Sequence, residues 1–438
     1  MTTDDTRDGA VKRRHLLATM GAVGAAGLAG CGGGGDGGDG GSDGGSGGDG
    51  GSDGGSDGGS TDGGDGGSSE PIVISSLQPL SGPFAVYGPR HRAGAEFAAA
   101  QINANGGVRG RELRIQTVDT ESSGEAVASA FTSHIEQDNA VAGIGPGGSE
   151  AAIRGRRVAE QNEVPIYMHA AGAVEVVPQD ARYTFRTALP ATPTVGRAQA
   201  QIIEDRGYNN IGVIYEDGVW GDEYSSAVEA YFPDDINVTS NTAPIPQTDF
   251  VPQLRQFPDD IEVFLGTGHP AGVSSLYPQM GEIGLEPELF LGAITPMEAD
   301  YNAIGESIGE SFASFNSTDM YADDYQEVAS TYTEETGGIF DHAQVNGYTA
   351  VQLIAQSIEE AGSADPTDIA EATRTGSFDL LYGADIQYTE WGEPEGAVLV
   401  HNSFDVGNSP DFWPETEFAP VEEHRTDPLP AFEPGELS

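Results

Sequence analysis

From residue 70 onward, short apolar runs rich in β-branched residues alternate with longer segments whose apolar positions repeat at helical spacing. This order predicts a parallel sheet covered by helices on both faces. The predicted strands are 72–77, 113–118, 141–144, 165–168 and 183–186, and the helices between them include 93–103 and 126–137.

The same alternation starts again after residue 190, which predicts a second α/β lobe. Its predicted elements are a helix at 194–206, strands at 211–215, 236–239, 263–265 and 289–291, and a helix at 271–283. Two long helices, 321–335 and 343–361, follow, and residues 409–438 are rich in proline and acid, which predicts an irregular segment.

The first 31 residues have the pattern of an export signal rather than of a folded element. Lys12, Arg13 and Arg14 precede an uncharged run that is too short to span a membrane, and the paired arginines favour the twin-arginine route. Leu28-Ala29-Gly30-Cys31 resembles the lipoprotein processing box, so Cys31 is the predicted lipid attachment site. The alternative is a stray thiol; as the only cysteine, it cannot form an internal disulfide.

Residues 32–69 consist almost wholly of Gly, Asp and Ser, a composition that cannot bury a core and predicts a disordered linker. A lipid anchor followed by such a tether would place the folded part just outside a membrane, on its extracellular face.

The charge balance is strongly acidic, with a formal net charge of −51, and Lys12 is the only lysine. Such a surface repels nucleic acid, so we expect no nucleic-acid partner. Concentrated salt would screen the self-repulsion, and the composition therefore predicts a protein from a strongly halophilic microbe. The alternative is an acidic calcium-binding surface, but the chain lacks the D-x-[DN]-x-[DN]-G loop.

The stretch VAGIGPGGSEAAIRG, which begins at Val141, combines a strand, a glycine-rich turn and a helix start. We expect Ser149 at the cap position and Glu150 in the first turn, where the helix dipole favours an acid. Three functions compete for this turn: a dinucleotide loop, a hydrolase elbow and a cradle for a ligand carboxylate. The first lacks its companion acid, since Met168 stands near the expected position. An ordinary tight turn would have the same glycines.

Histidine and cysteine usage predicts no metal site and no cofactor. The eight histidines are scattered without an H-x-x-x-H pair, and a single cysteine makes a structural zinc site improbable.

Several segments resemble the type I solute-binding proteins of ABC transporters, most closely the leucine/isoleucine/valine-binding branch. They are SLQPLSGPFAVYG, AGAEFAAAQINANGGVRGRELRI, the GPGGS turn, IGVIYEDGVWGDEY, VFLGTGHP and NGYTAVQLIAQSIEEAG, in order over roughly residues 71–405. The resemblance implies two doubly wound parallel-sheet lobes joined by three crossovers, closing on a small solute. It implies lobe 1 at 70–189 plus about 317–382, and lobe 2 at 190–316 plus about 383–408.

The resemblance also assigns candidate ligand-binding residues, position by position. The carboxylate-binding serine falls on Ser149, and the pair that completes its cradle falls on Ala170 and Gly172, where Gly172 departs from the usual threonine. The aromatic positions fall on Tyr87 and on Trp220, where tyrosine is common. A further aromatic position falls on Gly268, which leaves room for His269; a histidine beside Pro270 at a strand end is more often an ordinary turn residue.

In amino-acid-binding relatives two acids hold the ammonium group, and their positions here are Ala191 and Ile294. Neither can pair with a cation. Either the solute lacks an ammonium, which we favour, or a displaced acid replaces them, with Glu216, Asp217 and Glu298 as candidates.

We therefore expect a monomeric, lipid-anchored, non-enzymatic receptor that delivers a carboxylate-, amide- or amino-acid-type solute to an ABC permease. Two alternatives stay open. A ligand-sensing receptor without transport would share the fold, and an exported α/β hydrolase would need a histidine and an acid placed after Ser149.

Overall fold

A computed structural model describes residues 70–245, 247–266, 270–292, 295–304, 311–433 and 435–437. Four positions discussed above, Cys31, Gly268, His269 and Ile294, lie outside these residues, as do the predicted signal and linker.

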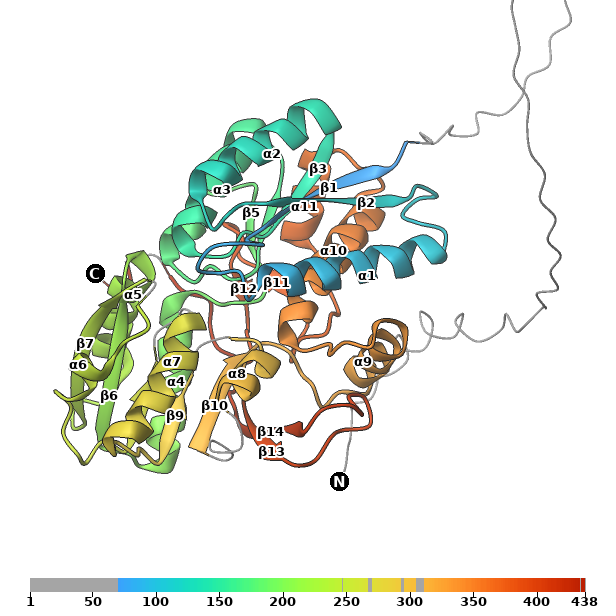
Figure 1. Cartoon of the computed structure of the whole chain (residues 1–438). Helices are drawn as coiled ribbons and strands as arrows, with labels where there is room; N and C mark the ends of the chain where they lie inside the picture. The colour runs from blue at the N-terminus through green and yellow to red at the C-terminus, as the bar shows by residue number, and fades with distance from the viewer. Residues whose placement is uncertain are drawn as a thin grey trace, which may run out of the picture. The chain divides into compact units, whose positions relative to one another are not determined.

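The first sheet has five parallel strands, and the chain forms them largely where the apolar runs predict (Figure 1). Their order is β2-β1-β3-β4-β5, with β1 (Ile72–Gln78), β2 (Leu113–Asp119), β3 (Ala140–Ile144), β4 (Ile166–Met168) and β5 (Thr184–Arg186). Helices α2 (Gly124–Asp138) and α3 (Ser149–Asn162) cover one face, and α1 (Gly88–Ala104), α10 (His342–Ala361) and α11 (Pro366–Thr375) cover the other.

The second sheet has seven strands in the order β14-β13-β10-β9-β8-β6-β7. Its strands are β6 (Asn210–Asp217), β7 (Asn237–Pro244), β8 (Val263–Leu265), β9 (Leu289–Leu291), β10 (Phe312–Asn316), β13 (Val400–Val406) and β14 (Phe418–Arg425). Helices α4 (Thr192–Arg206) and α5 (Val219–Tyr231) pack on one face, and α6 (Val251–Leu254), α7 (Pro270–Ile283) and α8 (Met297–Ile304) on the other. The first five strands in chain order are parallel, whereas β13 and β14 are antiparallel.

The chain passes between the two sheets three times: between β5 and α4, between β10 and α9 (Asp323–Thr336), and between α11 and β13. The third passage contains the small hairpin β11 (Gln387–Tyr388) and β12 (Pro394–Glu395), and the short helix η1 (Val174–Val176) follows β4. Below, lobe 1 denotes the first sheet with α1, α2, α3, α10 and α11, and lobe 2 the second sheet with α4 to α8. The fold is thus the predicted one, two α/β lobes linked by three crossovers.

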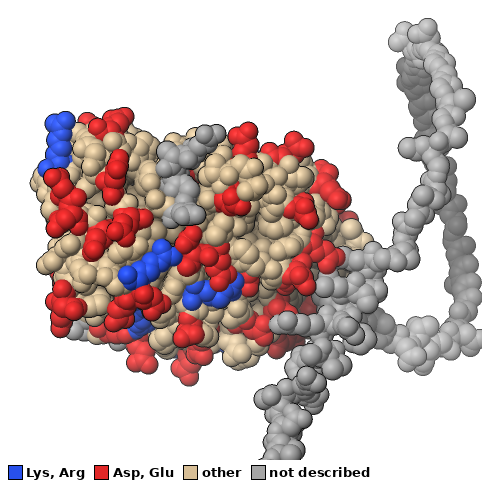
Figure 2. Space-filling view, turned by 90° about the horizontal axis from the view of Figure 1, so that it is seen from below, with Lys and Arg blue, Asp and Glu red and all other residues tan. Residues whose placement is uncertain are grey.

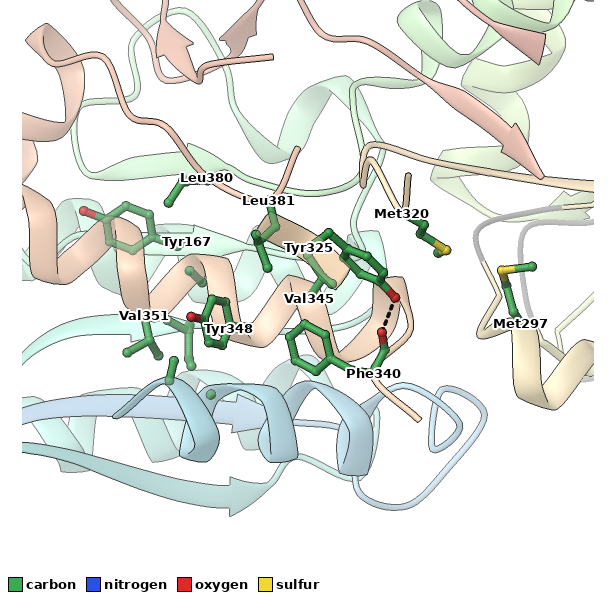
Figure 3. Packing of buried hydrophobic residues seen from close by; sticks show 14 of the residues in the cluster. Tyr167, Met297, Met320, Tyr325, Phe340, Val345, Tyr348, Val351, Leu380 and Leu381 are labelled. Carbon is green, nitrogen blue, oxygen red and sulfur yellow. Dashed lines mark hydrogen bonds between the residues drawn. The ribbon is translucent and has the colours of Figure 1, made fainter. Parts of the chain in front are cut away.

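Helices α1 and α10 approach each other closely because each has a glycine at the contact. A Cβ on Gly94 would lie 1.8 Å from the carbonyl oxygen of Gln344, and one on Gly347 would lie 1.9 Å from that of His91. Figure 3 shows the surrounding core, with Tyr348 and Val351 of α10 between the two helices. This contact fixes the start of α1, and with it the residues between β1 and α1.

Two expectations from the sequence are wrong in detail. Ser149 is the first residue of α3 rather than its cap, because Gly148, with φ of 88°, occupies the cap position. The C-terminal segment is not irregular throughout, since β14 pairs with β13 along 418–425. The aromatic side chains of Phe412, Trp413 and Phe418 anchor this part of the chain by burial, which outweighs its proline and acid content.

The acidic composition is visible on the molecular surface. Figure 2 shows Asp and Glu side chains scattered over one face, with few arginines among them. Several arginines of the described chain are held in ion pairs, such as Arg425 with Asp319 and Glu422.

Candidate ligand-binding site between the two lobes

The candidate site lies where strands of both lobes end, the usual place for ligands in open parallel sheets. Tyr87 directly precedes α1, Ser149 begins α3, and Ala170 and Gly172 follow β4, so these four come from lobe 1. Trp220 comes from lobe 2, in the first turn of α5. The structure thus places five of the six predicted ligand residues, and His269 is outside the described part.

Ser149 and the segment after β4 form one hydrogen-bonded unit. The backbone N–H of Ala173 donates to Ser149 Oγ at 3.2 Å, and the N–H of Gly148 donates to the carbonyl of Ala170 at 2.8 Å. Because Ser149 Oγ accepts from the backbone, its own hydroxyl proton is available to donate to an oxygen of a solute. A carboxylate or amide oxygen could accept a hydrogen bond from this hydroxyl.

Gly172 and Trp220 join the two lobes at this point. A Cβ on Gly172 would lie 2.6 Å from Trp220 Nε1, so the indole packs directly against the glycine. Trp220 is 8% exposed, and its Nε1–H has no hydrogen-bond partner within the described ranges. A buried indole N–H normally finds an acceptor. The indole of Trp220 occupies the space beside residue 172, which explains why a glycine stands there and not the usual threonine.

Three polar contacts accompany this packing. Val219 N at the start of α5 donates to Glu150 Oε1 at 3.4 Å, and Val174 N donates to Glu223 Oε2 at 2.6 Å. An ion pair of 2.9 Å joins Arg90 in α1 to Glu298 in α8. The lobes are thus in contact around the predicted site.

Phe84 completes the lobe 1 side and was not predicted. A Cβ on Gly148 would lie 2.9 Å from Phe84 Cε2, so the ring covers the glycine turn, and it stacks with Tyr87 at a centroid distance of 6.4 Å. The other motif glycines are packed just as closely: Gly143 lies against Phe131 and Gly145 against the carbonyl of Leu77. Packing therefore accounts for the G-x-G-x-x-G pattern, which removes the reason for a dinucleotide loop.

A buried ion pair holds the segment after β4 in place through hydrogen bonds to its backbone. Arg186 is fully buried and pairs with Glu393 at 2.8 Å. Its guanidinium also donates to the carbonyls of Ala171 and Ala173, on either side of Gly172. Because Glu393 lies in the third crossover, the cradle is tied to the segment that links the lobes. Sequence patterns offered no signal for this long-range pair.

Acidic groups approach the site from lobe 2. Glu216 is the last residue but one of β6 and is buried, and burial, together with the nearby charge of Glu150, raises its pKa to about 8. Burial raises the pKa of Tyr87, and the charges of Asp300 and Glu216 raise it further, so both acids lie near this phenol. Of the two other candidate acids, Glu298 is engaged by Arg90 and Asp217 is exposed. Glu216 is the one that could meet a cation.

A cavity beside the crossovers is lined by Thr187, Pro190, Ser317 and Tyr382 among others, but by none of the predicted ligand residues. Its walls are the linking segments themselves, whereas the unpartnered N–H of Trp220 lies beside Gly172, where the two lobes are in contact. In the described part of the chain no group of His, Cys, Asp and Glu side chains could hold a metal ion. No helix there is both long and apolar enough to cross a membrane.

Comparison with known proteins identifies the class to which this fold and site belong. Residues 71–402 match the periplasmic binding protein family, which covers most of the chain. The chain therefore belongs to this family, as a type I solute-binding protein of the kind that serves ABC transporters. The family and the relatives below are binding proteins and not enzymes, and the hydrolase alternative is set aside.

Two relatives resemble the chain over most of its length. The "Leucine-, isoleucine-, valine-, threonine-, and alanine-binding protein" of Pseudomonas aeruginosa is 25% identical over 335 residues, covering 72% of this chain and 85% of that protein. "Leu/Ile/Val-binding protein homolog 1" of Brucella suis biovar 1 is 26% identical over 340 residues, covering 75% of this chain and 89% of that protein.

Solved structures share the fold. The branched-chain amino acid transporter substrate binding protein LivJ from Streptococcus pneumoniae, in complex with isoleucine, superimposes with a TM-score of 0.69 at 16% identity, covering 80% of this chain and 99% of that one. A solute binding protein from R. palustris, in complex with benzoate, superimposes with a TM-score of 0.71 at 18% identity, covering 83% of this chain and 98% of that one.

Proposed function

We propose that this protein is a lipid-anchored receptor on the extracellular face of the cell membrane. It captures a small carboxylate- or amide-bearing solute between its lobes and passes it to an ABC permease. The observation that carries the proposal is that donors from different lobes border the segment 172–173: the Trp220 indole packs against Gly172, and the Ser149 hydroxyl accepts from the N–H of Ala173. Such donors stabilise a solute oxygen only when both lobes contact it, which couples binding to closure.

The relatives support a carboxylate as the shared recognition element. Their names and complexes include branched-chain amino acids and benzoate, which differ in the ammonium group but have a carboxylate in common. In this chain the cradle is retained and the cation side is changed, since Ala191 is a buried residue that caps α4. We therefore favour a solute without an ammonium.

A displaced acid is the second possibility, and Glu216 is the residue that would serve. An ammonium beside Glu216 would offset the burial of its carboxylate, and the pKa of this group, raised to about 8 by burial, would fall on binding. A substitution that removes the charge of Glu216 should therefore weaken the binding of an amino acid but not the binding of a carboxylic acid or an amide.

The N-terminal pattern supports lipid anchoring, and the family supports an ABC transporter as the partner. Lipid attachment at Cys31, the linker 32–69 and a monomeric state remain predictions, as does the halophilic origin. A sensor without transport would bind solute in the same way and differ only in its partner.

Solute carried through a gentle purification tests the proposal. The folded part would be purified in molar KCl, unfolded, and its released small molecules identified by mass spectrometry and titrated back. A carboxylate or amide that rebinds in a one-to-one ratio supports the proposal. A protein that neither releases a solute nor is stabilised by any amino acid, carboxylate or amide contradicts it.

A further inference from the structure

Two buried histidines lie beside the candidate site and are not used in the account above. His91 is in α1, one turn after Tyr87, and His169 directly precedes Ala170. Both have an exposure of 0%, and their rings meet edge to face with centroids 5.0 Å apart. Tyr87 stacks on His91 with a centroid distance of 5.8 Å. Each histidine therefore adjoins a residue of the predicted site: His91 adjoins Tyr87, and His169 adjoins Ala170.

Three of the four ring nitrogens lack a hydrogen bond. Neither Nδ1 nor Nε2 of His91 has a partner among the residues described here, and the same holds for Nε2 of His169. Burying such a polar group without a hydrogen bond lowers the stability of the folded state. The backbone of His91 cannot move away to relieve this, because Gly347 of α10 packs against its carbonyl.

The hydrogen-bond network assigns the tautomer of His169. Thr187 Oγ1 donates its single proton to the carbonyl of Met168 at 2.8 Å, so it can only accept from His169 Nδ1, which lies 3.4 Å away. Burial lowers the pKa of His169 to about 3, so the ring is neutral at neutral pH. Nδ1 then holds the proton, and Nε2 is an acceptor without a donor.

His91 is neutral as well, and it has one donor and one acceptor to offer. Burial lowers its pKa well below the usual range, and the nearby His169, His342 and Arg90 lower it further. The two rings together present two acceptors and one donor. A hydroxyl group matches this set, since it donates and accepts, whereas a methyl group leaves all three nitrogens unpaired.

We propose that His91 and His169 form a subsite that hydrogen-bonds a hydroxyl or N–H group of the captured solute. The solute then has an oxygen for Ser149 and Trp220 at one end and a hydrogen-bond donor at the other. This inference rests on the proposed function and narrows it, because a purely aliphatic or aromatic side group would be disfavoured.

Probe pairs that differ by one hydroxyl test the subsite. Calorimetry in molar KCl would compare valine with threonine, alanine with serine, butyrate with 3-hydroxybutyrate, and benzoate with 4-hydroxybenzoate. We expect the hydroxylated member of any pair that binds to bind at least tenfold more tightly. Equal binding within each pair, or tighter binding of the member without the hydroxyl, overturns the subsite while leaving the receptor function intact.

Substitution of the acceptor shows whether the histidines are responsible. His169→Phe should abolish the preference for the hydroxylated member, and His169→Gln should retain part of the preference. His401→Phe is the matched control, because His401 in β13 is equally buried and its ring nitrogens also have no partner in the described chain. A preference that survives His169→Phe overturns the inference. If no solute co-purifies and no probe stabilises the wild-type protein, both the proposed receptor function and the proposed subsite are contradicted.

Discussion

Gly172 of lobe 1 and Trp220 of lobe 2 pack so closely that a Cβ on the glycine would lie 2.6 Å from the indole nitrogen. Two departures from the pattern of the related binding proteins, glycine for threonine and tryptophan for tyrosine, therefore compensate each other in space. The contact also places an indole N–H, which has no partner among the described residues, beside Gly172, the neighbour of the Ala173 N–H that donates to Ser149.

Gly172→Ala should weaken solute binding by about tenfold, because a methyl group at this position forces the indole away and overpacking typically costs 1–3 kcal/mol. Calorimetry with the co-purified solute measures the change. Gly281→Ala is the control, since a Cβ on Gly281 in α7 meets nothing within 4 Å. The double change Gly172→Thr with Trp220→Tyr should recover most of the affinity; a loss as large as that of Gly172→Ala would disprove the compensation.

Glu216→Gln should change how stability depends on pH. The pKa of Glu216 is raised to about 8 by burial and lies near 4.3 in an unfolded chain, so between these values the folded state alone retains the proton. This group's contribution to stability is therefore present below about pH 4 and is lost as the pH rises to 8. Melting temperatures from pH 5 to 9 should fall less steeply in the variant.

Asp217→Asn provides the comparison, because Asp217 is the exposed neighbour of Glu216. It should leave the pH profile unchanged. The same Glu216 variant reports on the solute: weaker binding by tenfold or more indicates an ammonium, and unchanged binding indicates a solute without one. Parallel pH profiles for Glu216→Gln and the wild type would refute the placement of this acid in a buried site.

Most parallel strands could be predicted closely, because buried parallel strands are continuous apolar runs, as at Val263–Leu265 and Leu289–Leu291. Strand β7 extends to Pro244, beyond the predicted 236–239, and β10 and β13 have no counterpart among the predicted strands. Strand β14 could not be predicted either, since its alternation of polar residues depends on pairing with β13, a strand twelve residues earlier. In the site, Ser149 follows from the strand, turn and helix pattern around it, and Trp220 from the resemblance to the solute-binding family. Phe84 and Arg186 do not, because their roles arise from contacts with Gly148 and Glu393 that no local pattern records.

The fold should require salt. With a formal net charge of −51, dilute buffer leaves the repulsion between acids unscreened, whereas 1 M salt screens it within about 3 Å. Circular dichroism over a KCl series should show folded protein at molar concentration and cooperative unfolding on dilution. Full retention of structure at about 0.1 M KCl would remove the inference of a halophilic origin.

Cys31→Ser should release the protein from the membrane into the medium, because the substitution removes the predicted site of lipid attachment. Fractionation of cells that produce each form, followed by immunoblotting, measures the distribution. An Ala29→Gly variant, which keeps the cysteine and a small residue before it, should remain anchored. Membrane retention of Cys31→Ser would reject the lipoprotein interpretation.

The central claim, that a solute is held between the lobes at Ser149 and Trp220, is tested most directly by titration of the co-purified solute. Tryptophan emission and melting temperature would be followed together in the wild type, in Trp220→Phe and in Ser149→Ala. The account predicts that the wild type changes emission and melts at a higher temperature as the solute saturates. It also predicts that Trp220→Phe loses the emission change and that Ser149→Ala binds at least tenfold more weakly. Saturable binding that leaves both wild-type signals unchanged, or that persists at full strength in Ser149→Ala, would contradict the account.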